Sequence, residues 1–339
     1  MKKTRYNSYL SGTLPRGCQL CVKGEKSVLF VTGLCSRNCF YCPLSDLRKN
    51  KDVSYANERK FDDVSQLIKE IKLSNSKGCS LTGGDPLIKL DKTILFAKTL
   101  KKEFGKKFHI HIYLSTKLVD EKKLKELSNY VDEVRFHPNL QNSIDAEIKK
   151  ISLAKGLWQK KNIGIELPMF PNQSNQIFKF IKKVSPYISF VNFNELEVGE
   201  YSEKTMNRKY KTNKDGYTVK SSIKSGEKLI KRLEKEKLHL NFHLCTAELK
   251  NWHQYKNRLK KHKTFPFSKE TQDGTIIYFS TTDNKIKEKL KKRDYLEDNL
   301  KHQIIINPKK VRNLRNKFSI KRIEEYPTYD REEVESEDI

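Results

Sequence analysis

The sequence predicts an α/β protein built on a parallel sheet, with a small α+β unit at its C-terminal end. Two observations indicate this class: short apolar runs alternate with helical patterns between residues 27 and 200, and the alternation stops after Glu200. Alternating strands and helices are typical of parallel sheets, whose sites lie at the carboxyl ends of the strands. A third observation, five of the seven cysteines within residues 17–42, indicates where the chemistry is concentrated.

The strands are expected where short apolar runs occur. These runs are 27–32, 79–84, 108–114, 131–136, 162–167 and 188–196. The helices expected between them are 62–73, 91–104, 120–130, a helix from a cap at Asn142 or Ser143 to Trp158, and 175–184. In the first of these helices, Val64, Leu67 and Ile71 recur at helical spacing. Periodicity alone does not decide whether the sheet closes into a barrel.

Four regions follow from changes in this pattern. They are an N-terminal CxxC segment (1–26), the α/β core (27–200), a polar loop with a barrel-closing strand and helix (201–265), and a small α+β domain (266–339). The third region contains a strand at 238–242, and the fourth contains strands within 274–281 and 302–307. The acidic end, residues 330–339, is expected to fray.

The charge is strongly positive, with 69 Lys and Arg against 42 Asp and Glu. Most of the excess is lysine on helical segments, which is typical of solvated faces; the alternative is a surface for nucleic acid or an acidic partner. The densest runs are 255–263, 285–294 and 307–318. Because neither a signal-peptide core nor a membrane-spanning run is present, we expect a cytoplasmic protein, whose clustered thiols are metal ligands or catalytic groups rather than disulfides.

Cys35, Cys39 and Cys42 form a CxxxCxxC motif directly after the first strand. The same spacing would place three cysteines on one face of a buried helix, where each would act as a small apolar side chain. Residues that favour loops surround the thiols, however: Gly33, Ser36, Asn38 and Pro43. The motif therefore indicates a loop whose three thiols surround a single bound group. Three thiolates need a cation or cluster between them, and three ligands to a four-iron cube leave one iron open.

This motif resembles the CxxxCx(aromatic)C signature of the radical S-adenosylmethionine (SAM) superfamily, with Tyr41 at the aromatic position. The resemblance covers residues 27–200, because the six strand–helix units also match that family's partial (β/α)6 barrel. It implies that Cys35, Cys39 and Cys42 ligate a [4Fe-4S] cluster whose open iron is chelated by SAM. It also implies that the backbone of Tyr41 meets the adenine.

A second family motif, Gly-Gly-Glu-Pro, binds the methionine amino group at the end of the second strand. It is matched by Gly83, Gly84, Asp85 and Pro86, with aspartate in place of glutamate. Ser115, at the end of the third strand, is a candidate for the ribose, and a turn or helix cap is the alternative. Weaker candidates for cofactor binding are Glu166 on the fifth strand and Asn192 or Asn194 on the sixth. His137 and Met169 also lie at strand ends, where a histidine or methionine is more often a packing residue than a ligand.

The resemblance implies an enzyme that cleaves SAM reductively to a 5′-deoxyadenosyl radical, which abstracts hydrogen from a substrate. The opening around Cys35 to Cys42 is similar to proteins related to pyruvate formate-lyase activating enzyme, in an archaeal-type branch, which hints at a macromolecular substrate. A low-potential donor of the ferredoxin or flavodoxin type is expected. The alternatives are an RNA-binding protein with Fe–S or zinc sites, and an RNA-modifying radical enzyme. The pairing of the two motifs favours an enzyme.

Cys18 and Cys21 form a separate CxxC motif between glycines, a composition typical of metal knuckles. Of the remaining cysteines, Cys79 starts a strand and is expected in the core, so Cys245 is the better partner. We expect a second metal centre from Cys18, Cys21 and Cys245, with His243 (less readily His253) or an exogenous group as fourth ligand. Zinc is favoured if His243 completes it, and an auxiliary [4Fe-4S] cluster if the position stays open. The alternative is a redox-active or idle CxxC.

Overall fold

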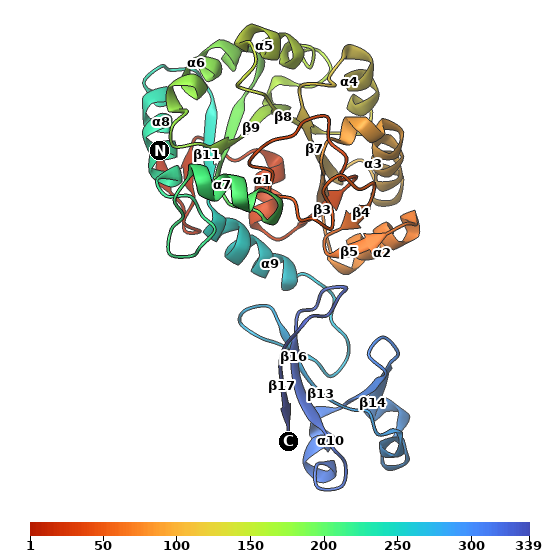
Figure 1. Ribbon diagram of the computed structural model, residues 1–339. Helices are drawn as coiled ribbons and strands as arrows, with labels where there is room; N and C mark the ends of the chain where they lie inside the picture. Colours follow the sequence, from red (N-terminus) through yellow and green to blue (C-terminus); the bar gives the residue numbers. More distant parts are fainter.

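A computed structural model describes residues 1–339, and its largest element is an 11-stranded sheet with the order β1-β2-β11-β10-β9-β8-β7-β6-β3-β4-β5 (Figure 1). The seven strands from β11 to β3 in this order are all parallel. They are β3 (Lys26–Phe30), β6 (Gly78–Thr82), β7 (His109–Ser115), β8 (Glu133–His137), β9 (Ile163–Met169), β10 (Phe190–Glu195) and β11 (Asn241–Cys245). The expected α/β class with a parallel sheet is thus confirmed.

Helices cover the outer face of this sheet, as Figure 1 shows. They are α2 (Val64–Leu73), α3 (Leu90–Phe104), α4 (Glu121–Ser128), α5 (Ile144–Ser152), α6 (Ser174–Val184) and α8 (Ser222–Glu234). One ends earlier than expected: α5 stops at Ser152 rather than Trp158. The chain turns there because Gly156 has φ +89°, a conformation that interrupts a right-handed helix.

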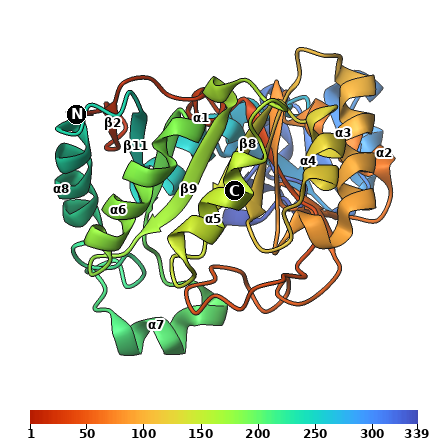
Figure 2. The same ribbon diagram turned by 90° about the horizontal axis from the view of Figure 1, so that it is seen from above.

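The sheet curves around α1 (Arg16–Val22) but does not close, because β3 and β11 are not paired. Figure 2 shows α1 at one end of the strands and α7 (Glu203–Lys209) at the other. This open sheet is the expected partial barrel. Its inner face is closed at one end by α1, and α7 lies in the segment that was expected to be an irregular loop.

The first residues of the chain join the same sheet. Strands β1 (Lys2–Lys3) and β2 (Tyr9–Ser11) form an antiparallel pair, and β2 pairs with β11. β11 begins three residues later than the strand expected at 238–242, because Lys237 and His239 both have positive φ and turn the chain. The N-terminal segment is therefore tied to the chain after the sixth strand through backbone hydrogen bonds.

Residues 269–338 form a second sheet beside the barrel (Figure 1). Its strands are β12 (Lys269–Glu270), β13 (Ile276–Thr281), β14 (Tyr295–Asp298), β15 (Gln303–Ile306), β16 (Lys321–Glu325) and β17 (Glu333–Asp338), with α10 (Pro308–Leu314) against it. The acidic end of the chain, which was expected to fray, instead forms β17 along β16. Basic β16 residues attract it: Arg322 lies 3.0 Å from Glu335.

No helix in the structure is both long and apolar enough to cross a membrane.

Candidate radical site at the carboxyl ends of the strands

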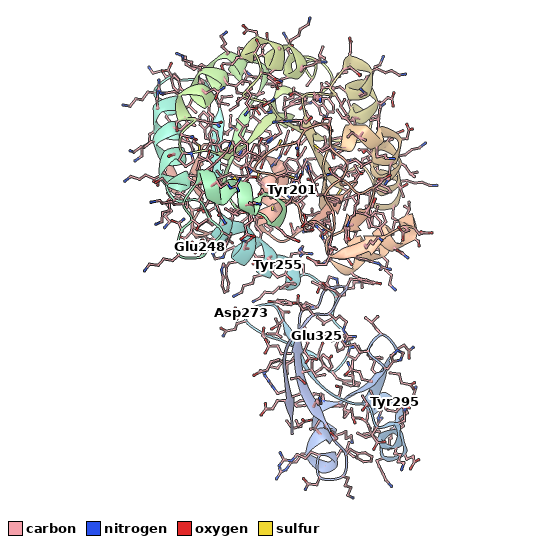
Figure 3. The ribbon with its side chains drawn as sticks, viewed as in Figure 1. Tyr201, Glu248, Tyr255, Asp273, Tyr295 and Glu325 are labelled. Atoms are coloured by element: carbon pink, nitrogen blue, oxygen red, sulfur yellow. The ribbon has the colours of Figure 1, made fainter.

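The three cysteines of the CxxxCxxC motif lie on the irregular segment that follows β3. All three are free and half-buried, and the Arg37 backbone N–H donates to Cys35 Sγ over 3.4 Å. Cys35 and Cys39 line a cavity of about 710 Å³, which Lys117 and Tyr201 also border. In Figure 3, Tyr201 projects over the middle of the barrel. Three free thiols within eight residues, beside a cavity of this size, are a donor set that fits a [4Fe-4S] cluster and a ligand on it.

The Gly-Gly-Asp-Pro segment after β6 is held against the cysteine segment by backbone hydrogen bonds. Gly84 N–H donates to Thr32 O over 2.7 Å, and Asp85 N–H donates to Leu34 O over 2.8 Å. A Cβ on Gly84 would lie 2.2 Å from Leu34 O, so no larger residue allows this approach. The segment continues into a 3-10 turn that begins at Pro86. The two family motifs therefore form one unit.

Asp85 links three elements of this unit. Its carboxylate is fully buried and accepts hydrogen bonds from Ser36 Oγ (2.7 Å), Ser115 Oγ (2.9 Å) and Leu87 N–H (3.1 Å). The side chain is thus occupied by protein donors. Asp85 O and Pro86 O also accept hydrogen bonds, from Ile88 N–H and Thr93 Oγ1, so the carbonyls of Gly83 and Gly84 are the acceptors of this segment left for a ligand. The Ser115 hydroxyl gives its hydrogen to Asp85, so its role toward a ribose, as an acceptor, stays a prediction.

Tyr41 and His137 form a hydrogen-bonded pair at the base of the cavity. His137 Nδ1–H donates to Glu166 O over 2.9 Å, so its Nε2 accepts from Tyr41 Oη, also over 2.9 Å. Burial, together with the positive charge of Arg37, lowers the pKa of His137 to about 4, so the imidazole is neutral. The Tyr41 ring packs on Phe170 at 4.9 Å between centroids. His137, which the sequence indicated as packing, is part of the wall of the site.

Tyr41 and His137 also line a second cavity, of about 380 Å³, among the carboxyl ends of the strands; we call it the inner chamber. Its polar lining includes Tyr41, His137, Tyr113, Glu166, Asn194, Glu195, Glu197 and Lys250. Lys250 lies 2.8 Å from Glu197, and burial raises the pKa of Glu195. We did not identify Glu195, Glu197 and Lys250 as site residues from the sequence. The two carboxylates could have been noticed because they follow the sixth strand. Nothing in the sequence points to Lys250, which comes from the helical segment after β11.

A buried ionic network lies beneath the chamber. Arg135, 1% exposed, contacts Glu133 (2.6 Å) and Glu166 (3.1 Å). Glu166 also accepts from the amides of Asn192 and Asn194, at 2.5 and 2.7 Å. These contacts fix Glu166, which faces the chamber, while Asn192 is buried beside it. Met169, which the sequence indicated as packing, is fully buried in the core.

In the second group of cysteines, Cys18 and Cys21 lie toward the other end of the barrel, whereas Cys245 ends β11 beside Asn194, at the carboxyl edge of the sheet. Cys18 and Cys21 lie on α1, a two-turn helix, rather than on the expected knuckle. Cys18 Sγ accepts from Arg135 Nη2 over 3.3 Å, and burial raises the pKa of this thiol to about 11. Cys245 is buried at the end of β11, and Cys79 lies in the core as expected.

His243 uses Nδ1 to contact Asn192, at 2.5 Å, and its buried Nε2 has no partner. No three His, Cys, Asp or Glu side chains converge in the structure to hold a metal, and this is true of both groups of cysteines. The ligand roles of Cys18, Cys21, Cys245 and His243 therefore stay predictions.

Comparison with known proteins agrees with this geometry. The family model for the Radical SAM superfamily matches residues 29–160 of this chain. A protein of Methanocaldococcus jannaschii named "Putative glycyl-radical enzyme activating enzyme" is 40% identical over 274 residues, which cover 78% of this chain and 72% of the relative.

Solved structures are more distant. The enzyme anSMEcpe with bound AdoMet is 17% identical with a TM-score of 0.39, and the match covers 74% of this chain and 72% of that one. The radical SAM methyltransferase TsrM from Kitasatospora setae, with tryptophan and a SAM analogue bound, is 10% identical with a TM-score of 0.36. That match covers 54% of this chain and 39% of TsrM.

The chain belongs to the radical SAM superfamily, and it is an enzyme. Within the superfamily it is related to the activating enzymes of glycyl-radical enzymes. Membership implies a [4Fe-4S] cluster, SAM as its ligand, cleavage of SAM by radical chemistry and a need for a reductant. The interpretation as an RNA-binding protein is not favoured.

Proposed function

We propose that this enzyme abstracts a hydrogen atom from a glycyl residue of a partner enzyme, which thereby becomes a protein radical. The name of the M. jannaschii relative suggests this class of substrate. The observation that carries the proposal is the inner chamber, whose lining combines carboxylates (Glu195, Glu197) with N–H donors (Asn194, Lys250). Each of these donors has a further hydrogen beyond the one given to Glu166 or Glu197. A peptide backbone needs both kinds of group, and glycine lets it approach closely because it lacks a Cβ.

The cofactors would be held by the residues of the two motifs. Cys35, Cys39 and Cys42 would ligate the [4Fe-4S] cluster, and the backbone carbonyls of Gly83 and Gly84 would accept hydrogen bonds from the methionine ammonium of SAM. The Tyr41 backbone would meet the adenine, and Ser115 would accept from the ribose. When bound, and given one electron from a ferredoxin- or flavodoxin-type donor, these cofactors supply the 5′-deoxyadenosyl radical that takes the hydrogen.

The protein's own groups would position the peptide. Arg135, Asn192 and Asn194 fix Glu166, so one carboxylate enters the chamber in a set orientation. The neutral His137 and the Tyr41 hydroxyl would separate the chamber from the outer cavity without adding charge. Such pre-set polar groups orient a substrate and exclude water from a reactive radical.

Deuterium transfer tests the proposal. The reconstituted enzyme, SAM and dithionite are mixed with protein extract from cells grown on Cα-deuterated glycine, and 5′-deoxyadenosine is analysed by mass spectrometry. We expect one deuterium in the product with that extract and none with extract labelled at Cα of alanine. Product formed without deuterium from the glycine-labelled extract would exclude glycine as the hydrogen source.

We also propose a second metal centre with Cys18, Cys21 and Cys245 as ligands. Arg135 donates to Cys18, and burial first, then the nearby Cys21 and Cys18, raises the pKa of Cys245. His243 Nε2 is buried without a partner, so it is a candidate fourth ligand for zinc. If the fourth position stays open, an auxiliary [4Fe-4S] cluster is favoured.

The triple variant Cys35→Ala, Cys39→Ala, Cys42→Ala separates the two centres. Metal analysis of this variant should still find zinc or iron, and adding Cys245→Ala should remove it. A folded triple variant that contains no metal would rule out the second centre without bearing on the first.

A further inference from the structure

A third cavity, of about 550 Å³, shares no lining residue with the two chambers of the radical site. Its wall is formed by β5 (Arg59–Phe61) and α2 of the barrel, and by residues 262–265 and 325–331. We call it the junction cavity. Figure 1 shows this region between β5 and the upper end of β16, and Figure 3 labels Glu325 there.

The junction cavity carries an excess of positive charge. Its basic residues are Arg59, Lys69, His262, Lys263 and Arg331, and its single carboxylate is Glu325. Glu325 is fully buried and already accepts from Arg331 and from Lys301, the latter over 2.8 Å. Arg331 also contacts Asp298. Glu70 lies 3.9 Å from His262. The charges of Arg59, Lys69 and Lys263 are left without a carboxylate partner.

Arg59 is the most informative of these residues. It is only 8% exposed, its Nε is sealed from solvent without an acceptor, and its guanidinium makes no hydrogen bond or salt bridge. Its Cζ lies 4.4 Å from the centre of the Tyr329 ring. A buried guanidinium is costly unless an anion or acceptor meets it. One stacked on an aromatic ring keeps its N–H groups free for a planar or phosphate oxyanion.

We propose that the junction cavity binds a phosphate-bearing small molecule of about nucleotide size. Arg59, Lys69 and Lys263 would contact the phosphate, since they are the cationic groups without partners. The volume exceeds that of a phosphate alone and falls in the usual range for small-molecule sites. Phe265 and Tyr329 offer ring surfaces for the remainder of the ligand. This site is independent of the proposed radical chemistry.

Titration calorimetry with the full-length protein tests the site, with inorganic phosphate, AMP and adenosine as probes. We expect phosphate and AMP to bind and Arg59→Gln to weaken AMP about tenfold or more, because a charge-assisted bond to phosphate is lost. Arg312→Gln is the matched control, since it removes an equal charge from the exposed face of α10. Adenosine binding that survives Arg59→Gln would belong to the adenine region of the radical site.

Tyr329→Leu provides a second variant, because Tyr329 is 45% exposed and its loss should not unfold the chain. It should weaken AMP but leave formation of 5′-deoxyadenosine unchanged. Three results would overturn the proposal: no phosphate or AMP binding by the wild type, equal AMP affinity in Arg59→Gln and wild type, or binding only to RNA with no mononucleotide affinity.

Discussion

The two groups of cysteines in this enzyme differ in access rather than in number. Cys35, Cys39 and Cys42 are half-buried on an irregular segment, and two of them border a large cavity. Cys18 and Cys245, by contrast, are each 6% exposed and lie on a helix and a strand, and Cys21, on the same helix as Cys18, is half-buried. A thiol on a loop beside a cavity can bind a ligand that must also meet a substrate. A thiol fixed in regular structure is suited to a closed structural or electron-transfer role.

The environment of each group reinforces this difference. In the half-buried group, Cys35 accepts from the neutral Arg37 backbone N–H, and the segment is held in place by Asp85. In the second group, Cys18 contacts the guanidinium of Arg135, whose charge is already shared by two carboxylates. The carboxyl end of the barrel therefore provides for chemistry and the closed end for stability, and the second metal that we propose would lie between α1 and the end of β11.

The largest expected effect comes from removing one thiol of the half-buried group. Cys39→Ala should lower 5′-deoxyadenosine formation at least about 100-fold, because a cluster ligand is lost. Iron content after reconstitution should fall in parallel. Cys79→Ala removes a thiol from the core instead, and it should lower thermal stability while iron and product stay near wild type. Equal product from the Cys39 and Cys79 variants would contradict the assignment of the two groups.

A large loss of stability is expected at the closed end. Arg135→Met should lower the free energy of unfolding by about 3–5 kcal/mol, since Glu133 and Glu166 would be left buried without their cation. Urea denaturation measures this loss of unfolding free energy. Arg322→Met, on an exposed pair with Glu335, is the control and should cost less than about 1 kcal/mol. Comparable losses of unfolding free energy for both variants would mean that the Arg135 network does not stabilise this end of the barrel.

A moderate effect is expected where the two motifs meet. Asp85→Asn should weaken SAM binding about tenfold, because it replaces one of the acceptor oxygens that hold Ser36 and Ser115. Equilibrium dialysis with the reconstituted enzyme gives the affinity. Asp91→Asn, on the exposed first turn of α3, should leave it unchanged. Unaltered affinity in the Asp85 variant would show that the cysteine segment is held by its backbone contacts alone.

Much of this arrangement was predictable from the sequence because local patterns fixed it. Alternation of apolar runs and helical periodicity gave all six core strands, and the CxxxCxxC spacing after a strand gave the segment that carries the site. What could not be predicted depends on long-range contacts. Lys250 reaches Glu197 from the helical segment after β11, and β17 pairs with β16, so neither has a local pattern.

The closed end shows the same limit. The CxxC composition suggested a loop knuckle, but Gly17 lies within a short helix inside the barrel and Gly24 follows it. Only the enclosing sheet makes so short a helix favourable. Arg135 and Glu133 are separated by one residue on β8. Because successive side chains of a strand point to opposite faces, the sequence alone predicts that these two share a face. That this face encloses Cys18 follows from the curvature of the sheet, which no local pattern specifies.

The smallest expected effect is at the Tyr41–His137 pair, of which Tyr41 lines both cavities and His137 the inner chamber. Tyr41→Phe keeps the ring against Phe170 and removes the hydroxyl that donates to His137 Nε2. The loss should cost about 0.5–1.5 kcal/mol of unfolding free energy, the usual contribution of one buried hydrogen bond. Iron content should not change, because the thiols keep their positions. The ratio of deuterium transferred to 5′-deoxyadenosine formed should fall, because the wall that excludes water is loosened. Tyr210→Phe, whose hydroxyl donates to Asn172 at an exposed position, is the matched control. If both variants keep the wild-type ratio and stability, the Tyr41 hydroxyl has no part in separating the two chambers, and the wall is made by packing of the rings alone.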